Sequence, residues 1–164
     1  MRVIDEYLIY NRPHQHPLTV NLGAETFASN NFLQALIQRI EKEWSHNLIF
    51  EVQSLDVIKN KNALNFMKKA RGLGCQFSSD YFGGGEAMLN GANRMQFNYV
   101  KLNAQKFQTI EEKKEMTQLV QKAQNLGLKI VLERIEEKID VTFAQKLGIP
   151  YIQGFYLGKP KENM

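Results

Sequence analysis

The stretch QKAQNLGLKIVLE, residues 121–133, decides the fold that we predict for this chain. A helical pattern from Thr109 runs into Leu126-Gly127, and a short apolar strand follows at once and ends on Glu133. Glycine suits the left-handed residue that closes a helix, and the leucine before it can pack back on the last turn. The same order of helix, Leu-Gly and strand returns at residues 73–74 and 147–148. Three such repeats are typical of βα units with a parallel sheet.

Polar residues close six short apolar runs that are typical of buried strands. They are Asn21, Glu51, Asp80, Lys101, Glu133 and Gln153. In α/β barrels the chemistry lies at the carboxyl ends of the strands, so the pattern indicates one convergent site. Because polar ends occur on all six strands and not around one switch point, a closed or partly closed barrel is favoured over a doubly wound sheet.

The strand count bounds the architecture. We predict one α/β domain over residues 1–164, a TIM-like barrel that is incomplete, because six strands are visible where such a barrel has eight. The chain opens on an expected helix, Val3–Asn11, with no strand before it. About two N-terminal βα units are therefore expected to be missing, either because the chain is a fragment or because it is a natural truncation.

Composition and charge exclude several classes of protein. No apolar run is long enough to span a bilayer, and the lone Cys75 can form no intrachain disulfide. A cytoplasmic location is expected, for the chain alone or as the cytoplasmic part of a membrane-anchored parent. The net charge is +4, but the lysines of residues 59–71 and 113–129 lie on helical patterns. A solvated helix face is favoured over a nucleic-acid interface, and neither a nucleic-acid partner nor direct membrane contact is expected.

Four of the strand-end residues are hard oxygen ligands, namely Asn21, Glu51, Asp80 and Glu133. Such a set suits Mg²⁺, Mn²⁺ or Ca²⁺ better than zinc. Lys101 would add a positive charge for a phosphate, and Gln153 could hydrogen-bond a substrate. Taken singly each residue is typical of a strand end that caps a turn, but together they favour a functional site.

A glycine-rich segment, residues 80–86, follows the third strand and is expected to form a loop. Consecutive glycines permit close backbone approach to a phosphate, so Gly83 and Gly85 are candidate ligand contacts.

Six motifs carry a resemblance to a known family. VNLGA, FEVQS, SDYFGGG, YVKLN, VLERIE and QGFYLGKP resemble, in order and spacing, VNLSA, LEITE, DDFGTG, LKID, VAEGVE and QGYLFGRP of EAL domains, over Ile4–Lys159. The resemblance implies a TIM-like barrel of the family that hydrolyses bacterial cyclic di-GMP to pGpG with two Mg²⁺ or Mn²⁺ ions.

The resemblance assigns roles position by position. Asn21, Glu51 and Asp80 fall on metal-ligand positions of the family. Lys101 matches the lysine that contacts the catalytic water, and Glu133 matches a metal-linked glutamate.

Further positions match the surroundings of the family's site. Glu136 matches a glutamate that supports the mobile loop and the dimer side, and Gln153 matches a glutamine near the site. Gly83 and Gly85 keep the frame of the loop.

Departures from the family pattern indicate a degenerate member. Tyr81 stands where the second aspartate of DDFG is expected, Asn103 replaces the aspartate of LKID, and Arg134 replaces the glycine of AEGVE. The segment with the EAL glutamate itself is also expected to be missing. Two-metal hydrolysis needs several carboxylates, so we expect metal binding to be weak or lost and Lys101 and Glu133 to be vestigial. Arg134 could help to hold phosphates.

We therefore predict a non-hydrolysing cyclic di-GMP receptor or a protein-interacting regulator in bacterial signalling. One alternative is a phosphodiesterase that is active only in a longer parent chain, and another is a dimerisation or interaction module that binds no nucleotide. The expected protein partner is an upstream GGDEF-like or sensor domain, or a second copy in a homodimer.

Overall fold

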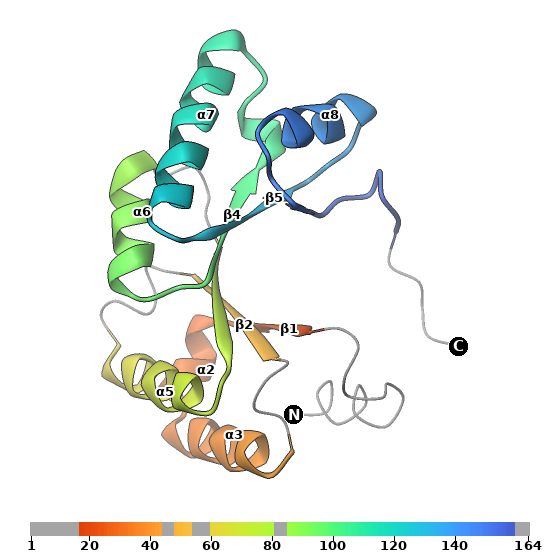
Figure 1. Cartoon of the computed structure of the whole chain (residues 1–164). Helices are drawn as coiled ribbons and strands as arrows, with labels where there is room; N and C mark the ends of the chain where they lie inside the picture. The colour runs from red at the N-terminus through yellow and green to blue at the C-terminus, as the bar shows by residue number, and fades with distance from the viewer. Residues whose placement is uncertain (1–16, 44–47, 54–59, 81–84, 160–164) are drawn as a thin grey trace. The chain divides into compact units, whose positions relative to one another are not determined.

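The computed structural model describes residues 17–43, 48–53, 60–80 and 85–159, and the expected helix at Val3–Asn11 lies outside these ranges. Strands and helices alternate along the chain, and the strand order in the sheet is β1-β2-β3-β4-β5-β6. The pairings of β1 with β2, of β4 with β5 and of β5 with β6 are parallel. The predicted α/β class with parallel strands is confirmed, and Figure 1 shows helices that alternate with strands along the chain.

The chain divides into two compact units, Met1–Ser78 and Ser79–Met164. The first holds β1 (Leu18–Leu22), α2 (Ala24–Ala28), α3 (Asn30–Glu43), β2 (Leu48–Gln53), α5 (Lys61–Gly72) and the start of β3 (Gln76–Asp80). The second holds α6 (Gly85–Arg94), β4 (Tyr99–Asn103), the 3-10 helix η1 (Ala104–Lys106), α7 (Ile110–Asn125), β5 (Lys129–Glu133), α8 (Lys138–Lys146) and β6 (Tyr151–Ile152).

Aromatic packing holds the first unit together. The ring of Phe50 on β2 lies 5.4 Å from that of Phe66 on α5 and 5.7 Å from that of Phe77 on β3. All three rings are almost fully buried, and the edge-to-face contact of Phe50 with Phe66 adds to the free energy of burial. Cys75, just before β3, is also buried, and this burial raises the pKa of its thiol to about 11. Cys75 therefore packs as a small buried hydrophobe.

Local signals set the helix ends. Gly74, Gly127 and Gly148 follow α5, α7 and α8 with φ of +90°, +73° and +65°, as the Leu-Gly pattern predicted. At the start of α7, Thr109 Oγ1 accepts from the Glu112 amide and Glu112 Oε2 accepts from the Thr109 amide. The Thr109 amide, together with the Thr109 hydroxyl and the Gln108 amide, bonds to the Glu112 carboxylate and holds the pKa of this group below its usual range.

Two short helices and one helix start were not predicted from the sequence. Helices α2 and α6 were missed, because α2 is only one turn long and α6 begins inside the glycine-rich segment. Helix α5 begins at Lys61, where Asn60 Oδ1 accepts from the amides of Asn62 and Ala63. From the sequence alone, the helix that carries Leu64, Met67 and Ala70 is predicted to start at about Asp56, and that position lies outside the described residues. None of the described helices is long and apolar enough to cross a membrane.

Candidate functional site

The first unit places two predicted metal ligands side by side. Asn21 on β1 is the register partner of Glu51 on β2. Neither residue closes its strand as predicted, because β1 continues to Leu22 and β2 to Gln53. Register partners of parallel strands project to the same face, so the two side chains lie side by side near the carboxyl end of this pair. Asn21 is exposed and Glu51 is half-buried, as a site open to a ligand requires.

Asp80 closes β3 as predicted and is half-buried. The glycine-rich segment after it enters a helix at Gly85. Gly85 has a φ of +66° and is the first residue of α6, so the prediction of a loop over residues 80–86 is wrong at Gly85 and Glu86. Tyr81 and Gly83 lie outside the described residues.

In the second unit, β4 extends beyond the residue that the sequence suggested. Lys101 was predicted to close this strand, but it is an interior residue and only 7% exposed. The strand continues because Leu102 and Asn103 pair in register with Leu132 and Glu133 of β5. Asn103 is therefore the residue at the strand end, and Lys101 projects to the same face as Asn103 one layer deeper.

Asn103 and Glu133 form the second amide–carboxylate pair at a strand end. Asn103 is 7% exposed, and its Oδ1 accepts a hydrogen bond from the Gln105 amide at 2.9 Å. This bond starts the 3-10 turn η1, so the amide oxygen serves the backbone. Glu133 is half-buried beside it.

A buried carboxylate that the sequence analysis missed organises the loop after β5. Asp140 is 8% exposed, and its Oδ2 accepts from the amides of Glu136 and Glu137 at 2.9 and 3.1 Å. Gln105 Nε2 donates to the same oxygen at 3.3 Å and to the Arg134 carbonyl at 3.0 Å. We call these bonds the Asp140 brace. They tie the residues after β4 to the loop that carries Arg134 and Glu136, both exposed.

Arg134 has a φ of +57°. A residue with a Cβ is strained in this left-handed region, whereas glycine adopts it freely. The glycine that the EAL motif has here therefore matches the backbone conformation, and the arginine departs from it at a cost in stability.

Backbone bonds fix Gln153 against the same loop. The Gln153 amide donates to the Leu132 carbonyl at 2.9 Å, and the Gln153 carbonyl accepts from the Ile135 amide at 3.0 Å. At Gly154 a Cβ would lie 2.2 Å from the Ile135 carbonyl oxygen, so only glycine allows this approach. The Gln153 side chain itself is exposed, beside Phe155 at 66% and Tyr156 at 49% exposure.

The donor set fits one divalent ion of the kind that the motifs imply better than it fits two. Asn21 and Glu51 together offer two oxygen ligands in one place, and Glu133 by itself offers a carboxylate in another. Oxygen ligands fit a hard cation such as Mg²⁺ or Mn²⁺. A second ion beside Glu133 fits poorly, because the neighbouring Asn103 is neutral and buried. Within the ranges that the structure describes, no three His, Cys, Asp or Glu side chains group closely enough to hold a metal.

Comparison with known proteins decides the family. The EAL domain family model matches residues 3–160. The chain belongs to the EAL domain family. The resemblance of the six motifs is thereby confirmed.

Individual relatives of this EAL domain are distant and longer. "Cyclic di-GMP phosphodiesterase PdeB" of Shewanella oneidensis is 24% identical over 153 residues, which are 89% of this chain and 18% of that protein. The chain thus spans about a fifth of the length of the curated relatives that it matches.

Two solved structures show the same fold. YkuI of Bacillus subtilis, in complex with substrate cyclic di-GMP and calcium, has a TM-score of 0.81 at 18% identity, covering 99% of this chain and 41% of that one. The S helix-GGDEF-EAL part of Vibrio cholerae LapD, bound to cyclic di-GMP, has a TM-score of 0.80 at 23% identity, covering 95% and 39%.

Proposed function

We propose that this chain is a degenerate EAL domain that binds cyclic di-GMP, or a protein partner, without hydrolysing the nucleotide. The observation that carries the proposal is Asn103. It stands in register with Glu133, is buried, and uses its oxygen to accept the Gln105 amide. A neutral side chain committed to a turn cannot replace the carboxylate that the family motif has there.

Loss of that carboxylate bears on catalysis rather than on binding. Two-metal hydrolysis needs anionic ligands that hold two cations about 4 Å apart and deprotonate a water between them. Removing one such electrostatic group typically lowers a rate by about 100-fold or more. Tyr81 removes a second anion from the family motif. In this proposal Lys101 and Glu133 are vestiges of the catalytic set.

One divalent ion remains compatible with the residues of the first unit. Asn21 and Glu51 would hold it. Asp80, which closes β3 in the second unit, matches a further metal-ligand position of the family motif. When bound, a Mg²⁺ or Mn²⁺ ion would polarise a phosphate oxygen of the ligand. We propose that this ion is weakly bound and assists nucleotide binding.

Several groups support nucleotide binding without chemistry. The exposed guanidinium of Arg134 can form paired hydrogen bonds to a phosphate, and the exposed Gln153 amide can reach a base edge. Phe155 and Tyr156 offer exposed rings on which a guanine can stack, which is worth about 1–3 kcal/mol per base. Gly83, Gly85 and Glu136 are proposed to frame the ligand as they do in the family motif.

Partners are proposed from the relatives. The LapD structure joins an EAL domain to a GGDEF domain, and "Bifunctional diguanylate cyclase/cyclic di-GMP phosphodiesterase MucR" combines both activities in one protein. We propose that a GGDEF-like or sensor domain is the partner of this chain, with a homodimer as the other arrangement.

A calorimetric titration with cyclic di-GMP, with and without Mg²⁺, tests the proposal. Binding at micromolar concentration or tighter, with no pGpG detected by chromatography after incubation with Mn²⁺, supports the receptor. The Arg134→Ala variant should bind more weakly, whereas Arg94→Ala, which removes an exposed arginine of α6, should not. Measurable pGpG would establish the phosphodiesterase instead. An absence of heat at millimolar nucleotide would leave the protein-interaction module.

A further inference from the structure

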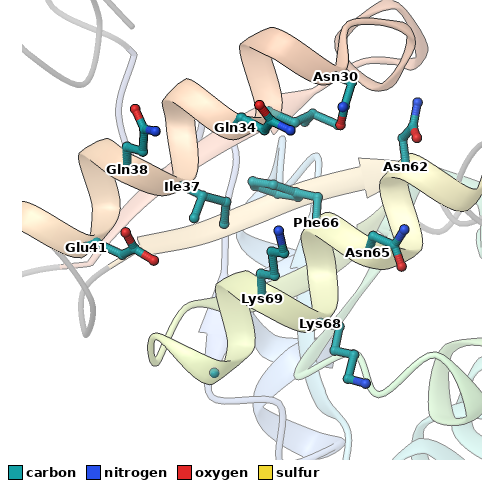
Figure 2. A pocket seen from close by; sticks show the side chains of 12 residues that line it. Asn30, Gln34, Ile37, Gln38, Glu41, Asn62, Asn65, Phe66, Lys68 and Lys69 are labelled. Atoms are coloured by element: carbon teal, nitrogen blue, oxygen red, sulfur yellow. The ribbon is translucent and has the colours of Figure 1, made fainter.

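A groove with a volume of about 970 Å³ runs between helices α3 and α5 of the first unit (Figure 2). It lies on the helices and not at the strand ends, so it is separate from the candidate nucleotide site. Ile37 of α3 and Phe66 of α5 meet at its floor and are only 8% and 3% exposed. The apolar seam between the helices is thus closed, and polar side chains line the space above it.

The lining forms one stripe along each helix. It extends from Asn30 to Glu41 on α3 and from Asn62 to Gly72 on α5. At a rise of 1.5 Å per residue each stripe is about 16 Å long. An extended chain of about five residues covers the same length. The shape therefore suits a peptide segment better than a compact small molecule.

Amide side chains dominate both rims. Gln34 and Gln38 border the groove from α3, and Asn62 and Asn65 border it from α5, all four of them exposed (Figure 2). A side-chain amide both donates and accepts hydrogen bonds. Two facing rows of amides match the alternating N–H and C=O groups of an extended backbone. This match favours a peptide over a ligand with one polar end.

Charge selects the kind of peptide. Lys68 and Lys69 of α5 line the groove and are exposed, whereas Glu41 is the only acidic residue among the described residues of the lining. Helix α5 contains no acidic residue at all. Lysines near a helix C-terminus also interact favourably with the helix dipole, but that interaction does not explain the amide side chains on the facing helix. We propose that the α3–α5 groove binds an extended acidic segment of a partner protein.

Fluorescence anisotropy of a labelled peptide tests this proposal on the full chain. The probe is a fluorescein-labelled heptapeptide of alternating Glu and Val, and the control probe has Lys in place of Glu. We expect the acidic probe to bind and the basic one not to bind. The double variant K68E/K69E should weaken binding at least ~10-fold, about 1.4 kcal/mol. The matched variant K114E/K146E changes exposed lysines of α7 and α8 and the total charge equally, and should bind within ~2-fold of the original chain.

A second variant tests the amide rims without changing charge. Asn65→Ala should weaken the acidic probe by ~3-fold or more, since a hydrogen bond contributes about 1 kcal/mol. Circular dichroism checks that each variant is folded. An equal loss in the two charge variants would show non-specific attraction and overturn the proposal, as would the absence of binding below ~1 mM probe. The test uses no nucleotide, so its outcome is independent of the proposed nucleotide function.

Discussion

Two pairs of neighbouring strands, β1 with β2 and β4 with β5, carry the same two side chains near their carboxyl ends in opposite states. Each pair joins an asparagine to a glutamate in register, Asn21 with Glu51 and Asn103 with Glu133. Asn21 is exposed, whereas Asn103 is buried and its oxygen accepts the Gln105 amide. The same residue pair can thus offer ligands at one strand end and support a turn at another.

The difference comes from the segment into which each strand leads. β1 leads into the short helix α2 through Gly23, which has no side chain to cap that helix. β4 leads directly into η1, and the Asp140 brace and the Gln153 contacts then hold the β5 end from two sides. The end of β5 is thus held by a dense framework of hydrogen bonds, and Asn103 beside it is a neutral side chain that bonds to the backbone.

The largest expected effect comes from breaking that framework with Gly154→Ala. The new Cβ would lie 2.2 Å from the Ile135 carbonyl oxygen, so the backbone must move and the bonds between Gln153 and the β5 end must break. We expect a loss of at least about 3 kcal/mol in the free energy of unfolding, measured by urea denaturation.

Gly158→Ala is the matched control for this change. A Cβ at Gly158 meets no atom within 4 Å, and the residue is exposed. The control should change stability by less than about 0.5 kcal/mol. Equal effects of the two alanines would show that the close approach at Ile135 does not hold the strand end.

Much of this framework could be predicted from the sequence, but the contacts between residues far apart in the chain could not. The Leu-Gly helix ends and the strand that closes on Glu133 are local signals, and the structure has them. The interior position of Lys101 depends on pairing with β5, which no local pattern reports. Asp140 could in part have been predicted from the sequence, because it stands three residues after Glu137 at a helix start, as a capping carboxylate does. Its bond to Gln105 joins distant parts of the chain and needed the structure.

Restoring a carboxylate at β4 sharpens the comparison between the two strand ends. Asn103→Asp places a negative charge beside Glu133, so a divalent ion should bind more tightly there. We expect a gain of about tenfold in Mn²⁺ affinity by calorimetry, or about 1.4 kcal/mol. Without metal the two carboxylates repel each other, and stability should fall by about 1 kcal/mol. Asn93→Asp on the exposed face of α6 is the control and should change neither quantity. If Asn103→Asp bound Mn²⁺ no more tightly than the original chain, the missing negative charge at position 103 would not be the reason for weak metal binding beside Glu133.

The smallest expected effect separates backbone strain from ligand binding at Arg134. Arg134 and Gln96 both have a φ of +57°, both are exposed, and both lie in the second unit. Replacing either with glycine relieves about 1 kcal/mol of strain, and the greater freedom of glycine in the unfolded chain offsets part of that gain. Arg134→Gly and Gln96→Gly should therefore each raise the free energy of unfolding by about 0.5 kcal/mol, measured by urea denaturation. Only Arg134→Gly should weaken cyclic di-GMP binding, because only it removes a cation from the loop after β5. If both variants bind the nucleotide as the original chain does, Arg134 is merely a strained residue, and the receptor must hold its phosphates elsewhere.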